Sequence, residues 1–153
     1  MTSFRVLFLL VSLPSCHLLA GDSVGLVPAL GLRWQSLSKV EVAAGPGYVG
    51  EHFSVCPQVT ISKYHTGFDL YLGMSPTRNT STSIFELFLR PRIQNFNVNT
   101  GLSPIESWHG RSLGIEAGAL FAADGLPLQV FIGYAKSSSN NEHKSYAGIA
   151  VGW

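Results

Sequence analysis

The sequence predicts an all-β protein: an antiparallel, up-and-down, eight-stranded transmembrane β-barrel that follows an N-terminal signal peptide. Segments of about ten residues alternate apolar and polar side chains with a period of two, and none of them has a sustained helical period. Seven charged residues within these segments fall on the face opposite the large aliphatic side chains. With 46% hydrophobic and 12% charged residues, the composition argues against a disordered chain and against a nucleic-acid partner.

The first twenty residues are expected to be a signal peptide. Arg5 supplies a positive charge, residues 6–13 form an apolar run, and Ala20 is a small residue suited to cleavage. The apolar run is too short to cross a bilayer as a helix. In an alternative interpretation, Cys16 of "LPSC" is retained and lipidated. If the signal peptide is cleaved after Ala20, residues 21–153 form a single barrel domain. Its one cysteine, Cys56, then has no disulfide partner within the mature chain.

The first four predicted strands, residues 24–34, 39–49, 53–62 and 67–74, each carry an apolar stripe at every second position. Glycines and Pro46 interrupt the second stripe, which is the weakest of the set. Small or polar residues occupy the positions between. The four stripes are Val24, Leu26, Leu30, Leu32 and Trp34; Val40 and Val42; Phe53, Val55, Val59 and Ile61; and Phe68, Leu70, Leu72 and Met74.

The last four predicted strands are residues 83–93, 112–121, 126–136 and 145–153. Their stripes are Phe85, Leu87, Leu89 and Ile93; Leu113, Ile115, Ala117, Ala119 and Phe121; Leu128, Val130, Ile132 and Tyr134; and Ser145, Ala147, Ile149, Val151 and Trp153. Strands of about 9 to 11 residues are long enough to cross a bilayer when tilted by about 45°. The longest connections fall on one side and the tight "AADG" turn on the other, which is typical of outer-membrane barrels.

The strand charges are expected to meet inside the barrel, where they would form a mutually compensating network. An eight-stranded barrel is only wide enough inside for side chains, and unpaired buried charges cost several kcal/mol each. A lumen filled in this way argues against a general pore. The alternative is a soluble exported β-barrel or sandwich binding protein, with the aliphatic stripes as its core. The charges concerned are Arg33, Glu41, Asp69, Glu86, Arg90, Arg92 and Glu116.

With this pattern over its whole mature length, the chain resembles the small eight-stranded outer-membrane β-barrels of Gram-negative bacteria, of the OmpA, OmpX and NspA type. The resemblance implies a monomer in the bacterial outer membrane, in contact with membrane lipid and lipopolysaccharide, with an envelope structural or surface-interaction role. In that group a terminal aromatic residue, preceded by apolar residues at alternate positions, is the signal read by the barrel-assembly machinery. Ile149, Val151 and Trp153 correspond to that signal here.

A second, local resemblance suggests an alternative function. The stretch "HKSYAGI" at residues 143–149 resembles the His-x-Ser motif of PagL-type lipid A deacylases, although Tyr146 replaces the Asn of that family. The resemblance implies an ester hydrolase with His143 as the base and Ser145 as the nucleophile, and Glu142 is a candidate carboxylate to orient the base. No catalytic residues are assigned outside this alternative.

Basic residues near the predicted outer ends of the strands are candidate contacts to lipopolysaccharide phosphates. They are Lys63, Arg111, Lys136 and Lys144. The spacing of the histidines shows no zinc signature, and we expect neither a metal nor a cofactor.

Overall fold

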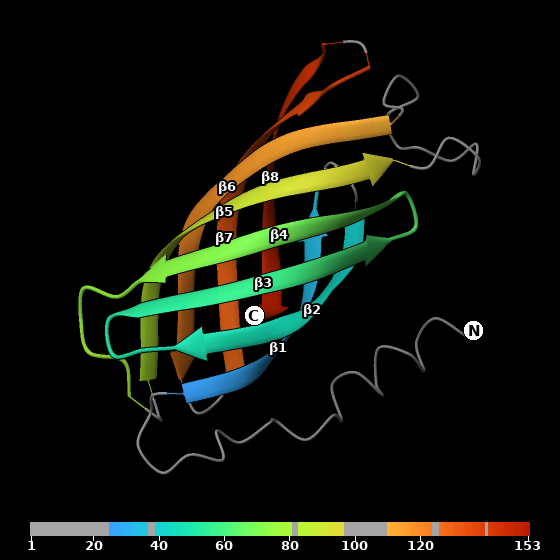
Figure 1. The fold of residues 1–153 in the computed structure, drawn as a ribbon. Helices are drawn as coiled ribbons and strands as arrows, with labels where there is room; N and C mark the ends of the chain where they lie inside the picture. The colour runs from blue at the N-terminus through green and yellow to red at the C-terminus, as the bar shows by residue number, and fades with distance from the viewer. Residues whose placement is uncertain (1–24, 37–38, 81–82, 97–109, 124–125, 140) are drawn as a thin grey trace, which may run out of the picture.

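The computed structural model describes residues 25–36, 39–80, 83–96, 110–123, 126–139 and 141–153, so the predicted signal peptide and Cys16 lie outside the described residues. The described residues form a closed barrel of eight antiparallel strands in sequence order, with β1 paired to β8 (Figure 1). The predicted all-β, up-and-down fold class is confirmed. The described part contains no helix long and apolar enough to cross a membrane. The strands are β1 (Gly25–Gln35), β2 (Lys39–Val49), β3 (Phe53–Ser62), β4 (His65–Met74), β5 (Ser83–Phe96), β6 (Gly110–Ala123), β7 (Leu126–Ser137) and β8 (His143–Gly152).

The barrel has two distinct ends. The loop end carries the β1–β2, β3–β4, β5–β6 and β7–β8 connections. The terminal end carries the other three connections, the start of β1 at Gly25 and the end of β8 at Gly152. In Figure 1 the front strands β3, β4 and β5 cross steeply over β7 and β8 behind them, as expected from the tilt of strands in a closed barrel.

The β5–β6 hairpin is longer than the alternation predicted. Its register runs without interruption from Ser83 opposite Ala123 to Phe96 opposite Gly110. The predicted ends at residues 93 and 112 were too short, because polar residues can continue a ladder after the apolar stripe has ended. Similarly, β4 begins at His65, two residues before the predicted start, and β8 begins at His143.

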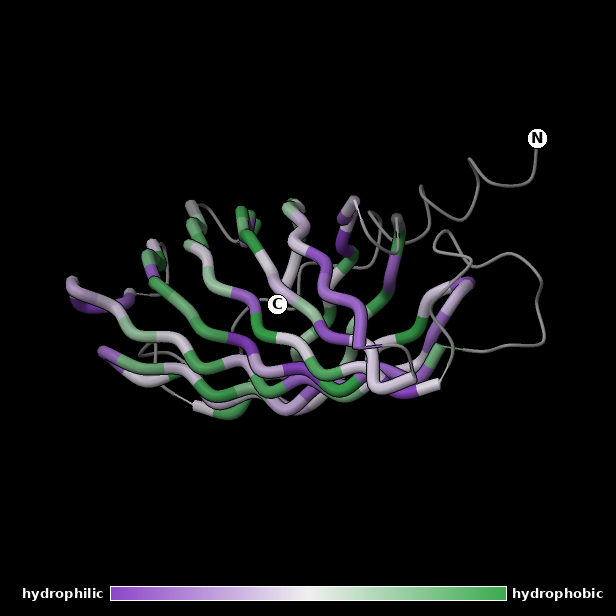
Figure 2. The backbone as a smooth tube through the Cα atoms, turned by 90° about the horizontal axis from the view of Figure 1, so that it is seen from above, coloured by the Kyte–Doolittle hydropathy of each residue, from purple (hydrophilic) through white to green (hydrophobic). Residues whose placement is uncertain are grey.

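Side chains alternate between lumen and outer wall as the sequence pattern predicts. Figure 2 shows hydrophilic and hydrophobic residues succeeding one another along the strands. The predicted stripes lie on the outside: Leu26 is 85% exposed and Ile132 is 69% exposed. The lumen holds the charges, since Arg33 and Arg90 are both 0% exposed. The alternative in which the aliphatic stripes form a dry core is therefore wrong.

Closure of the barrel between β1 and β8 departs from the regular pattern at the last residue. Gly152 adopts a φ of 95°, a conformation that side chains with a Cβ rarely accept. Trp153 then donates its backbone N–H to the carbonyl of Leu30 at 3.1 Å, and its ring packs edge-on against Tyr71 with centroids 5.7 Å apart. The expectation that Trp153 lies with the outward stripe is wrong, because the turn at Gly152 directs its ring against a lumen residue.

Candidate functional site

Arg92 is the centre of the lumen. It enters from β5 with a fully buried guanidinium group, which lies 2.7 Å from Glu41 of β2 and 3.1 Å from Asp69 of β4 and also pairs with Glu116 of β6. One cation thus joins acids from three other strands across the barrel. The sequence predicted that these residues share the inner face, and the structure brings them into contact.

The other two arginines extend this cluster in opposite directions. Arg33 of β1 lies 3.0 Å from Glu41 and also pairs with Asp69, while Gln58 accepts a further hydrogen bond from it. Arg90 of β5 lies 2.7 Å from Glu116 and donates to Gln129. Hydrogen bonds to neutral side chains satisfy part of the donors that the acids do not reach, whereas Arg33 Nε and Arg90 Nε have no hydrogen-bond partner among the described residues. We call Arg33, Arg90, Arg92, Glu41, Asp69 and Glu116 the arginine cluster.

His65 extends the polar network toward the loop end. It is 0% exposed, and its Nε2 lies 3.1 Å from Glu41 Oε2 and 2.9 Å from the Gln94 amide nitrogen. Its Nδ1 lies 2.8 Å from Ser62 Oγ, which also accepts the backbone N–H of His65 at 3.0 Å. The Phe96 ring covers His65 with centroids 5.1 Å apart. Sequence reasoning missed this role, although His65 precedes Gly67 and Asp69 in the inward phase.

An aromatic layer separates the arginine cluster from the terminal end. The Arg90 guanidinium carbon lies 4.6 Å from the centroid of the Phe88 ring, and 5.5 and 5.6 Å from those of Tyr71 and Phe131. Glycines on neighbouring strands make room for these rings: a Cβ at Gly118 would lie 2.8 Å from Phe88, and one at Gly148 would lie 2.4 Å from Phe131. The sequence showed inward aromatics and inward glycines, and the strand register of the structure places Phe88 opposite Gly118 and Phe131 opposite Gly148.

Glu86 lies apart from the arginine cluster, near the terminal end. It accepts hydrogen bonds from Ser54 at 2.5 Å, Asn79 at 2.8 Å and Tyr71 at 3.0 Å. No Arg, Lys or His of the described part of the chain forms an ion pair with it. The prediction that all seven strand charges form one compensating network is wrong for Glu86, because neutral donors surround it. We call Ser54, Tyr71, Asn79 and Glu86 the Glu86 cluster.

The four predicted lipopolysaccharide contacts lie in three different places. Arg111 and Lys136 are exposed on the outer wall at the loop end, on β6 and β7. Lys63 is exposed in the β3–β4 connection, with its ammonium group 5.8 Å from the Tyr64 ring centroid. Lys144 pairs in register with Ala135, which is fully buried, so it belongs to the lumen phase of β8.

His143 and Ser145, the residues of the deacylase-like motif, both lie exposed on the outer wall of β8. The His143 ring stacks on Tyr134 with centroids 5.5 Å apart, and its Nδ1 is hydrogen-bonded to the Tyr134 hydroxyl. The structure therefore brings His143 to Tyr134 and forms no hydrogen bond between His143 and Ser145. A serine nucleophile needs such a bond to its base.

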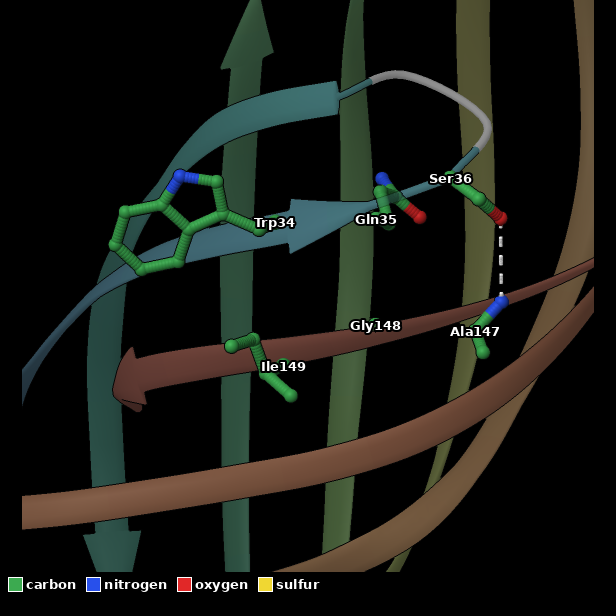
Figure 3. A pocket seen from close by; sticks show the side chains of 6 residues that line it. All are labelled: Trp34, Gln35, Ser36, Ala147, Gly148 and Ile149. Carbon is green, nitrogen blue, oxygen red and sulfur yellow. Dashed lines mark hydrogen bonds between the residues drawn. The ribbon is translucent and has the colours of Figure 1, made fainter.

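A shallow groove marks the outer wall where β1 meets β8 (Figure 3). Trp34 and Ile149, which stand opposite one another in the β1–β8 register, lie at one end of it, and Ser36 and Ala147 lie at the other end. At its loop-end edge the backbone N–H of Ala147 donates to Ser36 Oγ at 3.4 Å. The lining is mostly apolar and faces the same way as the exposed stripes.

Within the described ranges, no group of three or more His, Cys, Asp or Glu side chains is arranged to hold a metal ion. His65 is buried in the lumen and His143 lies on the outer wall, so these two do not meet. No protein-family model, no curated protein and no solved structure matches this chain.

Proposed function

We propose that this chain is an integral β-barrel protein of a Gram-negative outer membrane, with an envelope structural or surface-interaction role. The observation that carries the proposal is the outer wall, on which large aliphatic side chains from all eight strands are exposed. Soluble monomers rarely expose a contiguous apolar patch larger than a few hundred Å². A lipid environment stabilises such a wall, and barrel closure pairs each strand with a neighbour on both sides, β1 and β8 included over Gly31–Gln35.

The lumen supports the further proposal that the protein is not a general pore. Arg33, Arg90 and Arg92 are all at most 2% exposed, and their ion pairs join opposite sides of the barrel. A path for water would require breaking these contacts and leaving charges unpaired in a narrow space. Planar-bilayer recordings should therefore show no steady conductance, and a stable open channel would contradict this part of the proposal.

Export and assembly follow from the same proposal. Residues 1–20 would direct the chain through the inner membrane and be removed. The barrel-assembly machinery would then recognise Ile149, Val151 and Trp153 before folding, and the protein would insert as a monomer in contact with lipid and lipopolysaccharide.

The test is insertion of the refolded chain into phosphatidylcholine vesicles. We expect the chain to co-float with the vesicles and to migrate differently on a gel before and after heating. Replacing Ile132, in the middle of β7, with Lys should hinder insertion, because a basic residue at the bilayer midplane costs about 2–4 kcal/mol. Thr66→Lys is the matched control, since Thr66 is also exposed but lies near the loop end of β4. A chain that stays soluble and folded without vesicles or detergent would overturn the proposal.

A further inference from the structure

Three basic side chains form a row across β6, β7 and β8 at the loop end of the outer wall. Lys136 stands directly opposite His143 in the β7–β8 register. Ser138, two residues after Lys136, donates its backbone N–H and its hydroxyl to the Arg111 carbonyl at 2.9 and 2.5 Å, which fixes Arg111 beside β7. All three basic side chains are exposed on the same face as the aliphatic stripes.

The face that carries this row contains no described acid. The other outward positions of β6, β7 and β8 are apolar or carry a hydroxyl group, as in Leu113, Tyr134 and Ser145. Glu142, immediately before β8, is half-buried, and its carbonyl accepts the backbone N–H of Ser137 at 2.9 Å. Stacking on Tyr134 orients the His143 ring within the row. Two cationic side chains and an imidazole on one face, beside an apolar wall, suit the negative charge and the acceptor oxygens of a phosphate ester at a membrane surface.

The groove between β1 and β8 shares β8 with this row and lies further toward the terminal end. Ala147 follows His143 by four residues on the same face of β8, which places it about 13 Å further along the strand. Trp34 and Ile149 lie at the end of the groove that is further from the row (Figure 3). A charged row with an apolar groove beneath it has the polarity of a lipid molecule, with its headgroup at the surface and a chain below.

We propose that these two features form one binding site for a phosphorylated lipid of the outer leaflet. The phosphate lies against Arg111, Lys136 and His143, and one acyl chain lies in the groove beside Ala147. The site rests on the proposed membrane function, because only a bilayer with the loop end outward presents such a lipid to it. The site also reduces the four lipopolysaccharide contacts predicted from the sequence to two, because Lys63 and Lys144 lie outside the site.

The phosphate part is tested by native mass spectrometry of the refolded full chain, with lipid A and its dephosphorylated form as probes. Retention of lipid A should exceed retention of the dephosphorylated form. The double variant Arg111→Ala/Lys136→Ala should weaken lipid A binding roughly thirtyfold, as expected from the loss of two basic residues near a membrane surface. The matched control is Lys63→Ala, which removes an equally exposed charge outside the site. Unchanged binding in the double variant, or equal loss in the control, would overturn the site.

The proposed binding of an acyl chain in the groove is tested by filling the groove with a larger side chain. Ala147→Phe should weaken retention of lipid A several-fold, and inorganic phosphate alone should not compete with lipid A at equal concentration. Wild-type affinity in Ala147→Phe, or full competition by inorganic phosphate, would refute the groove as part of the site.

Vesicle insertion and heat-modifiable migration are measured on the same samples. A chain that fails to insert defeats the proposed membrane function and the site with it. A chain that inserts normally but shows no preference for lipid A over its dephosphorylated form defeats the site alone.

Discussion

Glu116 and Glu86 are two buried carboxylates in the same lumen that are held in opposite ways. Glu116 lies 2.7 Å from Arg90, also pairs with Arg92, and accepts the Tyr146 hydroxyl at 2.9 Å. Among the described residues, Glu86 accepts its hydrogen bonds from the neutral donors of the Glu86 cluster. Both side chains are at most 1% exposed, so burial does not distinguish them. The difference lies in which strands and connections surround each one.

The two carboxylates therefore stabilise different parts of the barrel. The arginine cluster joins β1, β2, β4, β5 and β6 across the lumen. The Glu86 cluster instead attaches the β4–β5 connection to the terminal end. The Asn79 side-chain amide donates to Glu86 and to the Gly50 carbonyl, and its backbone N–H donates to the Glu51 carbonyl at 2.9 Å. Ion pairs therefore stabilise the middle of the barrel, and hydrogen bonds from neutral donors to Glu86 stabilise its terminal end.

The largest effect is expected from Arg92→Met. The substitution keeps an apolar stem but leaves Glu41, Asp69 and Glu116 with less compensation in a buried site. Removing one partner of a buried pair costs about 3–5 kcal/mol, so the free energy of unfolding should fall by at least that amount. Urea unfolding of the vesicle-inserted chain, followed by fluorescence, measures it. A loss below about 1 kcal/mol would show that the cluster contributes little.

The matched control for Arg92 is Arg78→Met. Arg78 pairs with Glu51 at 2.8 Å, but the two side chains are 66% and 47% exposed. An exposed pair of this kind contributes less than about 1 kcal/mol, so this variant should unfold close to the wild type.

Paired neutral substitutions test the comparison directly. Glu116→Gln removes the charge opposite two arginines and should cost about 3 kcal/mol of unfolding free energy. Glu86→Gln keeps the shape of a side chain that has neutral partners and should cost about 1 kcal/mol, mainly from one mismatched hydrogen bond. The same urea measurement compares them. Equal losses would remove the distinction between the two sites.

Gly133→Ala is expected to lower the free energy of unfolding by less, because it crowds the lumen without removing a charge. A Cβ at Gly133 would lie 2.3 Å from the Tyr146 ring, whose hydroxyl donates to Glu116. Overpacking of this kind costs about 1–2 kcal/mol. Gly25→Ala is the control, because a Cβ there meets nothing within 4 Å. If Gly133→Ala unfolds like this control, the ring has room to move.

The smallest change in stability is expected when the salt concentration is raised. Raising the ionic strength should leave the stability difference between wild type and Arg92→Met nearly unchanged, because buried pairs are poorly screened. The small contribution of Arg78 should shrink under the same conditions. A strong salt dependence of the Arg92 effect would mean that water reaches the cluster.

The sequence alone determined which side of the wall each strand residue faces. Alternation with period two is a property of each strand by itself, so the inward position of Arg33, Glu41 and Asp69 and the outward position of Ile132 could be predicted without knowing the neighbours. The barrel, and the set of inward charges from which the arginine cluster is drawn, followed from that pattern.

Only the tertiary structure decided which inward residues meet. The stagger of strands around a closed barrel sets the height of each inward position, and this stagger depends on every pairing at once. Arg92 therefore reaches Glu41, which lies 51 residues earlier, whereas Glu86, only six residues before Arg92, meets Ser54, Tyr71 and Asn79 instead. The ring of Trp153 turned inward for a similarly non-local reason, because closure against β1 required the left-handed conformation of Gly152.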